Sequence, residues 1–143
     1  MKQRYVCTFA SFVILAAGAC GGSSTPTTPA PPAPFNVSAG GTLGPSEYTA
    51  VPFTAPRAGA ATIEVSWTGS GNIDIYLTGP SCEAFPLGGA CPILSMSQTM
   101  SANPEQIIRN VQAGEQFKVF AANRPINGSQ MNTLTYTVSV KIP

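Results

Sequence analysis

Hydrophobic and polar residues alternate with a period of two along most of the chain after residue 60, and no stretch there sustains a helical period. This alternation is typical of β-strands that bury one face. It predicts four clear strands, at residues 61–68, 72–78, 117–121 and 133–141. Three weaker strands are predicted at residues 47–54, 93–100 and 105–111.

The expected buried faces follow from the same pattern. The last strand is the clearest, because one of its faces is entirely apolar, with Leu134, Tyr136, Val138 and Val140. Trp67 shares a face with Ile63 and Val65, so we interpret it as a core residue rather than a platform for sugar stacking. Turn signals such as Gly69–Gly71 and Gly79-Pro80 separate the strands. Short strands of this kind form an all-β fold, an antiparallel β-sandwich.

The first 19 residues have the pattern of an export signal. A start with Lys2 and Arg4 is followed by the apolar stretch Val6–Ala19. At about 1.5 Å per residue, a helix of this length spans about 21 Å, which is less than a hydrocarbon core of about 30 Å. We therefore interpret residues 1–19 as a signal peptide that is removed, and not as a transmembrane helix.

The end of that stretch, Leu15-Ala-Ala-Gly-Ala-Cys20, resembles the lipobox of bacterial lipoproteins. The resemblance implies cleavage before Cys20 and lipidation of its thiol, although Ala17 stands where the family usually has Leu. Ala17-Gly18-Ala19 also fits the small-x-small rule of ordinary secretion, so a plain secreted protein is the alternative. Gly21 follows the cysteine in place of the aspartate that retains some relatives in the inner membrane, which implies an outer-membrane destination.

Residues 20–34 are predicted to be a disordered linker that begins at the lipidated Cys20. Five prolines, with Ser and Thr between them and no charge, occur among residues 21–34. Such a stretch buries too little apolar area to fold. The linker would act as a stalk of about 40 Å, at about 3.1 Å per residue. The folded domain is then residues 35–143, the size of a single sandwich.

The net charge argues against a nucleic-acid partner, and the cysteines predict a disulfide. Removal of residues 1–19 leaves five basic and six acidic residues, so no basic surface for nucleic acid is expected. In an oxidising compartment Cys82 and Cys91, nine positions apart, are predicted to form a disulfide that closes a loop. We expect this disulfide to stiffen the loop without holding the domain together.

Several segments of the chain resemble the bacterial pre-peptidase C-terminal domain, a jelly-roll-like β-sandwich of secreted proteases and surface proteins. The matching segments are Tyr48-Thr-Ala-Val-Pro-Phe53, Gly59 before Ile63–Trp67, Asp74-Ile-Tyr-Leu77, Val111-Gln-Ala-Gly114 before Phe117–Val119, and Tyr136-Thr-Val138. They span most of residues 46–140. The resemblance implies a single jelly-roll-like sandwich that is presented outside the cytoplasm.

The same resemblance raises the question of calcium, which some relatives bind. The family often has Asp-x-Asp before its Leu-Tyr-Leu-like strand, whereas this chain has Asn72 and then Asp74, its only aspartate. A hard cation needs several carboxylate or carbonyl oxygens. We therefore expect no metal and no cofactor, and Asp74 is only a weak metal candidate.

Catalytic motifs are not found in the sequence. The chain has no histidine, no G-x-S-x-G elbow and no S-x-x-K pair, and its five glutamates are scattered. We therefore predict that the protein is not an enzyme. Asp74 and Tyr76 share the face opposite Ile75 and are expected to be a surface pair, and Arg124 is expected at a solvated loop tip.

The function predicted from these observations is that of a non-catalytic module in the bacterial cell envelope. It would be held to the membrane by the N-terminal lipid and would act in adhesion or as an accessory protein by binding an unknown protein or envelope partner. The alternative is a carbohydrate-binding module, which needs exposed aromatic side chains. Phe85 is the only aromatic residue among the predicted loops that could serve.

The order of the strands predicts which loops lie together, because successive loops alternate between the two ends of the sandwich; we call this strand parity. If each strand crosses the sandwich once, loops 55–60, 79–92 and 112–115 share one end, and loops 69–71, 101–104 and 123–132 share the other. We expect the disulfide loop, with Glu83, Phe85 and Leu87, to be the recognition surface and Phe85 to be its apolar anchor. The loop that carries Arg124, Asn127 and Met131 would lie at the opposite end and could not join it in one small site.

Overall fold

The computed structural model describes residues 30–85, 91–100, 102–124 and 132–143. All regular secondary structure within these ranges is β-strand, and no helix there has the length and apolarity to cross a membrane. The strands are β1 (Phe35–Leu43), β2 (Tyr48–Thr54), β3 (Gly59–Thr68), β4 (Asn72–Thr78), β5 (Ile93–Ser97), β6 (Glu105–Val111), β7 (Gln116–Arg124) and β8 (Leu134–Ile142). The predicted signal peptide, Cys20, and Leu87, Asn127 and Met131 lie outside the described residues.

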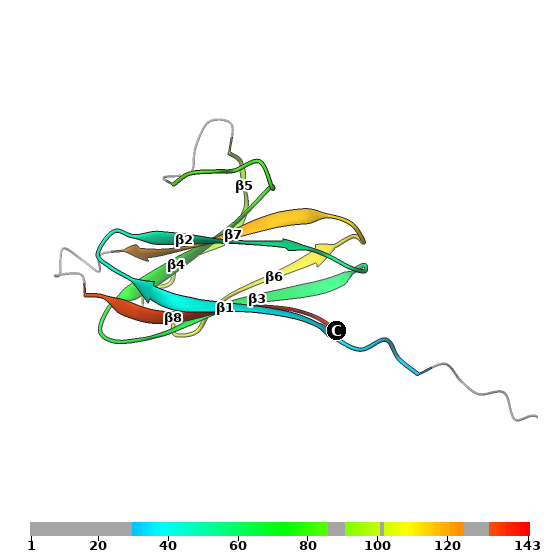
Figure 1. Cartoon of the computed structure of the whole chain (residues 1–143), viewed down its shortest axis with the longest axis horizontal. Helices are drawn as coiled ribbons and strands as arrows, with labels where there is room; N and C mark the ends of the chain where they lie inside the picture. Colours follow the sequence, from blue (N-terminus) through cyan, green and yellow to red (C-terminus); the bar gives the residue numbers. More distant parts are fainter. Residues whose placement is uncertain (1–29, 86–90, 101, 125–131) are drawn as a thin grey trace, which may run out of the picture. The chain divides into compact units, whose positions relative to one another are not determined.

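The strands form two antiparallel four-stranded sheets that pack face to face (Figure 1). One sheet has the order β1-β8-β3-β6, and the other has the order β2-β7-β4-β5. This is the strand arrangement of a jelly roll. The predicted all-β antiparallel sandwich is therefore confirmed.

The main core lies between the two sheets and is built from the faces that the alternation predicted. Ile63 and Val65 of β3 are fully buried, and Trp67 is 8% exposed. The indole Nε1 of Trp67 donates a hydrogen bond to the carbonyl of Gly71 at 3.1 Å. The interpretation of Trp67 as a core residue is confirmed.

Two strand predictions differ from the structure. β1 was not predicted, although Phe35, Val37 and Ala39 turn inward and pack against the core. β5 ends at Ser97, whereas the sequence pattern extended it to residue 100.

The connections alternate between the two ends of the sandwich, as strand parity predicts. Reciprocal backbone hydrogen bonds join Ala55, after β2, to Gly114 and Glu115, after β6. At the other end, Asn132 donates to the carbonyl of Ser70 at 3.0 Å. The turns at residues 55–58 and 112–115 therefore lie together, and residue 132 lies beside the β3–β4 turn.

The sheet that contains β4 is covered on both faces. All seven residues of β4 are buried, including Asp74, 6% exposed, and Tyr76, 5% exposed. A second apolar cluster, formed by Tyr76, Cys82, Phe120 and Ala122, packs on the outer face of this sheet. The prediction that Asp74 and Tyr76 form a surface pair is wrong, because the disulfide loop folds over them.

Candidate functional site

Four aromatic rings and one guanidinium group gather on the outer face of the β2-β7-β4-β5 sheet, and we call these five residues the aromatic site. They are Tyr48, Tyr76, Phe85, Phe120 and Arg124. The Phe85 ring lies 5.4 Å from Tyr48, 5.5 Å from Tyr76 and 6.5 Å from Phe120, measured between ring centroids. These are the separations at which tilted aromatic pairs attract one another.

The register of the sheet explains how residues from three strands meet there. Tyr76 of β4 lies directly opposite Phe120 of β7, and Phe120 lies opposite Ala50 of β2. In the next row, Ala122 separates Tyr48 from Asp74. Residues directly opposite each other share a face, and the small alanine side chains leave room for the Phe85 ring above the sheet.

The disulfide loop is fastened to the sheet at its beginning. Cys82 and Cys91 are joined as predicted, and Cys82 is 2% exposed within the outer cluster. The Lys118 Nζ atom donates to the carbonyl of Cys82 at 2.5 Å and pairs with the Glu83 carboxylate at 3.1 Å. Glu83 itself is exposed, so this ion pair contributes little to stability. The disulfide is thus part of a packed cluster and does more than stiffen a surface loop.

A polar network lies beside the aromatic rings and centres on the Asp74 carboxylate. Its Oδ1 accepts a hydrogen bond from Asn72 at 2.6 Å, and its Oδ2 accepts one from Tyr76 at 3.2 Å. Gln98 donates to the Tyr76 hydroxyl at 2.6 Å and to Asp74 at 3.4 Å. Burial and the neighbouring Asp74 raise the pKa of Tyr76, so its phenol stays protonated and donates. Asp74 therefore holds Tyr76 in place.

Arg124 lies at the border of the site, between the aromatic rings and the polar network. Its guanidinium carbon is 5.4 Å from the centre of the Phe85 ring, and its Nε atom is 4.0 Å from Asp74 Oδ2. The side chain remains 46% exposed. Part of the side chain is therefore open to solvent, while its orientation is set by a cation–π contact and a charged neighbour.

The position of Arg124 corrects one prediction. The strands do alternate as parity requires, but the disulfide loop does not stay at its own end. It turns back along the outer face, so that Phe85 reaches Arg124. Phe85 is also half-buried against three rings rather than free as an isolated anchor.

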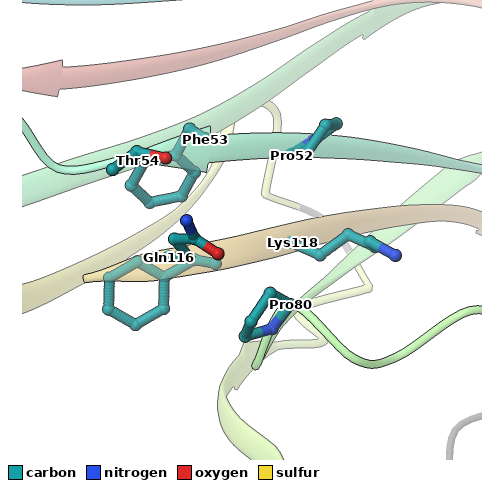
Figure 2. Close-up of a pocket in the computed structure, with 7 residues that line it drawn as sticks. Pro52, Phe53, Thr54, Pro80, Gln116 and Lys118 are labelled. Atoms are coloured by element: carbon teal, nitrogen blue, oxygen red, sulfur yellow. The ribbon is translucent and has the colours of Figure 1, made fainter. Parts of the chain in front are cut away.

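Two hollows flank the aromatic site. One, of about 490 Å³, adjoins Tyr48 and is lined by the β1–β2 turn and by Tyr136. The other, of about 420 Å³, lies at the start of the disulfide loop; Figure 2 shows Pro52 and Thr54 of β2, Gln116 and Lys118 of β7, and Pro80 around it. The first hollow has one charged residue in its lining, Glu47, and the second has one, Lys118.

The polar groups beside the aromatic rings do not form a metal site in the described part of the chain. Among the described residues, no group of three or more His, Cys, Asp or Glu side chains is placed to hold a metal ion. Asp74, the weak metal candidate, already accepts hydrogen bonds on both oxygens. What the site offers a ligand is an exposed guanidinium and the edges of aromatic rings.

One further carboxyl group is buried close to this network, in the core between the sheets. Glu105 is 0% exposed; its Oε1 accepts from the backbone N–H of Thr99, while its Oε2 has no hydrogen-bond partner. Burial raises the pKa of this carboxyl. A group whose pKa is raised on folding adds stability below its unfolded pKa, and that contribution is lost as the pH rises through its folded pKa.

Glu105→Gln is therefore expected to raise the free energy of unfolding at pH 7.5, because the amide removes the buried negative charge while its oxygen can still accept from the Thr99 N–H. The gain should shrink as the pH falls toward 4, because the native carboxyl is then also neutral. Urea unfolding at a series of pH values measures both effects, with Glu64→Gln as a control for net charge. A gain that does not depend on pH would contradict this explanation.

Sequence reasoning identified Phe85 and the disulfide but did not identify Tyr48, Tyr76, Phe120 and Arg124 as one site. A signal was present in β7, where Phe120 and Ala122 are apolar although they alternate with the inward-facing Val119 and Ala121. Apolar residues on both faces of a strand indicate that both faces are covered. Leu87, the third residue predicted for recognition, lies outside the described residues.

Comparison with known proteins shows which fold the chain has but does not assign it to a family. No family model and no curated protein matches the sequence. One solved structure that is similar is that of Aeromonas hydrophila PliG, a periplasmic lysozyme inhibitor of g-type lysozyme, with a TM-score of 0.52 and 11% sequence identity. The match covers 76% of this chain and 86% of the PliG chain. At this level of identity, the similarity shows that the two chains share a fold.

Proposed function

We propose that this protein is a lipid-anchored module of the bacterial cell envelope that binds another protein, without catalysis, through the aromatic site. The observation that carries the proposal is the exposed part of that site. Tyr48 is 40% exposed and the Arg124 side chain 46% exposed. Tyr and Arg are the residue types that most often dominate the binding energy of protein interfaces.

The support beneath these two residues favours a binding role. Tyr48 packs against the rings of Phe85 and Phe120, and Arg124 is held between Phe85 and Asp74. Side chains that are already ordered lose less conformational entropy when a partner binds. The sheet beneath them is buried on both faces, so the site is presented on a rigid surface.

The similarity to PliG suggests a class of partner. That protein is a periplasmic inhibitor of a lysozyme, and we propose that the partner here is also a hydrolase of cell-wall glycans. Such enzymes act through a pair of carboxylates. A half-exposed guanidinium is well suited to them, because it forms two parallel hydrogen bonds to one carboxylate. The resemblance to the pre-peptidase C-terminal domain also agrees with an exported accessory module and stays a prediction.

Arg124→Ala and Tyr48→Ala are each expected to weaken binding of a g-type lysozyme about tenfold or more, equivalent to about 1.4 kcal/mol. Binding is measured by surface plasmon resonance with the full chain, and inhibition by the rate at which the lysozyme clears a cell-wall suspension. Thr137→Ala, on an exposed position of the other sheet, is the matched control and should leave affinity unchanged.

The outcomes separate the alternatives. Tight binding that neither variant weakens would show that the aromatic site is not the interface. Absence of lysozyme binding, together with capture of another envelope protein that Arg124→Ala abolishes, would keep the site and reject the partner class. Binding on a glycan array that Tyr48→Ala removes would favour the carbohydrate-binding module instead.

The anchor is tested separately. Cys20→Ser is expected to move the protein from the membrane fraction to the soluble fraction, because two or more acyl chains hold a protein on a bilayer almost permanently. Cell fractionation and mass spectrometry of the N-terminus provide the measurement. Wild-type protein that is already soluble, with an unmodified N-terminus, would show that the lipid anchor is wrong.

A further inference from the structure

The exposed large hydrophobic residues of the described chain are concentrated along one side of the sandwich. Five of the six lie on β5, shortly after it, or on the adjacent edge strand β6. They are Ile93, Leu94, Met96, Met100 and Ile108, from 37% to 66% exposed. Single exposed apolar residues are normal, but Ile93, Leu94 and Met96 are neighbours on one short strand, and such a group marks an interaction surface.

β5 is an edge strand, and its own residues include neither a charge nor a proline. The features that do protect it, a bulge in the pairing at Leu77 and Thr78 and the Arg109 side chain on the Leu94 carbonyl, lie at its start. In Figure 1 it lies at the margin of the sandwich, beyond β4, and it pairs with β4 alone. Residues 84–104, which include β5, contain no charged side chain. The other edge of the same sheet, β2, contains Pro52, which blocks pairing. β1 presents mainly polar residues and glycine outward, and β6 contains the charged Glu105 and Arg109. Among the described edge strands, β5 is therefore the one without a charge, a proline or a glycine.

The backbone of β5 has free hydrogen-bonding groups on its outer side. The carbonyl of Leu94 points away from β4, since it accepts a hydrogen bond from Arg109 Nη1 of β6 at 3.2 Å. The N–H of Asn123 in β7 bonds toward β2, so the alternate residue Val119 does too, and Leu77, which lies opposite Val119, bonds toward β5. Ser95, opposite Leu77, therefore bonds to β4, and the backbone groups of the next residue, Met96, point outward. A carbonyl oxygen has two lone pairs, and Leu94 can therefore accept a second bond while Arg109 stays in place.

We propose that β5 pairs antiparallel with β5 of a second copy of this chain, around a two-fold axis at Ser95. Leu94 of each copy then lies opposite Met96 of the other, with the free backbone groups of both residues facing each other. The two sheets join into one sheet of eight strands. Apolar side chains meet apolar side chains across the axis, which is the self-complementarity that a two-fold interface requires.

The charge pattern favours a second copy over a different protein. A charge close to a two-fold axis meets its own like charge, which destabilises the pairing. Residues 84–104 contain no charge, so the two copies of β5 do not repel each other through their own side chains, which suits a strand that meets itself. The charge closest to this edge is that of Arg109, which reaches Leu94 from β6. The bulge in the β4–β5 pairing lies at Leu77 and Thr78 and leaves Leu94 without a partner in β4, whereas the segment from Ser95 to Ser97 is paired regularly.

Ser95→Cys tests the axis directly. Cβ atoms of directly opposed residues lie about 4.5–5.5 Å apart, close enough for two cysteines to form a disulfide after a small shift. We expect the full chain with this change to migrate as a covalent dimer on a non-reducing gel of alkylated whole cells. Ser38→Cys, at an exposed position of the edge strand β1, is the matched control, and wild type gives the background from the native cysteines. Both should migrate as monomers on this denaturing gel, because neither has a cysteine at the axis.

Met96→Lys tests the same interface without a new cysteine. Met96 is 55% exposed, so the change should not disturb folding. Two lysines near the axis should convert the purified full chain from twice the monomer mass to the monomer mass in analytical ultracentrifugation, whereas Ser38→Lys should not. A wild-type chain that is monomeric throughout a dilution series, or a Ser95→Cys chain that cross-links only to a different protein, would overturn the proposal. Because neither measurement involves the partner, failure here is distinct from failure of the proposed function.

Discussion

Phe120→Ala is expected to lower the free energy of unfolding by about 3–5 kcal/mol, the range for removing a fully buried phenylalanine. Phe120 is 0% exposed although its side chain points away from the main core. It lies on the sheet beneath the outer cluster, with its ring centroid 5.9 Å from that of Tyr48 and 6.5 Å from that of Phe85. Its loss leaves a cavity under the disulfide loop, so the loop should loosen while the two sheets stay packed.

Phe117→Ala is the matched control for this change. Phe117, on the same strand, faces the main core and stacks on Phe53 with ring centroids 5.3 Å apart. Both variants should lose similar stability in urea unfolding. Only Phe120→Ala should speed local hydrogen exchange of the residues around Cys82 and Phe85 relative to the rest of the domain. Equal exchange of these residues in the two variants would contradict the idea of a separate outer cluster.

The strands that the sequence predicted best are those with one buried and one solvated face. β3 and β8 lie in the sheet whose outer face is open, so polar and apolar residues alternate and the pattern alone identifies the inward residues. Val65 and Val138 lie directly opposite each other in this sheet, and both were assigned to the core. Local pattern succeeds here because burial depends only on which face a residue occupies.

β1 was not predicted because its pattern is weak. Gly40 and Gly41 interrupt it, and Asn36 and Ser38 have low strand propensity. Its place is fixed by pairing with β8, whose own alternation provides the partner surface. Contacts between residues about a hundred positions apart are not visible in a short sequence window.

The aromatic site could not be predicted for a related reason. The sequence correctly placed Asp74 and Tyr76 opposite Ile75, but a strand pattern does not say whether a distant loop covers that face. The covering loop is held by Cys82 and Phe85, and its path back to Arg124 is a property of tertiary packing. Strand parity locates the ends of a loop and not the course between them, which is why it wrongly separated Phe85 from Arg124.

Replacement of both Cys82 and Cys91 by alanine is expected to cost about 2.5 kcal/mol, as the chain-entropy estimate for a loop of this length suggests. The main core does not include either residue, so the sandwich should remain folded. The outer cluster should open, because Cys82 packs in it directly and Phe85 follows three residues later. Urea unfolding measures the first effect, and near-ultraviolet circular dichroism of the tyrosines measures the second.

The same variant links the disulfide to binding. If the disulfide loop supports Tyr48 and Arg124, opening it should weaken partner binding by as much as Arg124→Ala does, even under conditions where the domain is fully folded. Chemical reduction of wild type should reproduce both effects, which excludes a defect of the alanine side chains. Complete unfolding on reduction would mean that the disulfide holds the whole domain. Unchanged binding by a folded, reduced protein would mean that the aromatic site keeps its shape on the sheet alone, with Phe120 rather than the disulfide as its principal support.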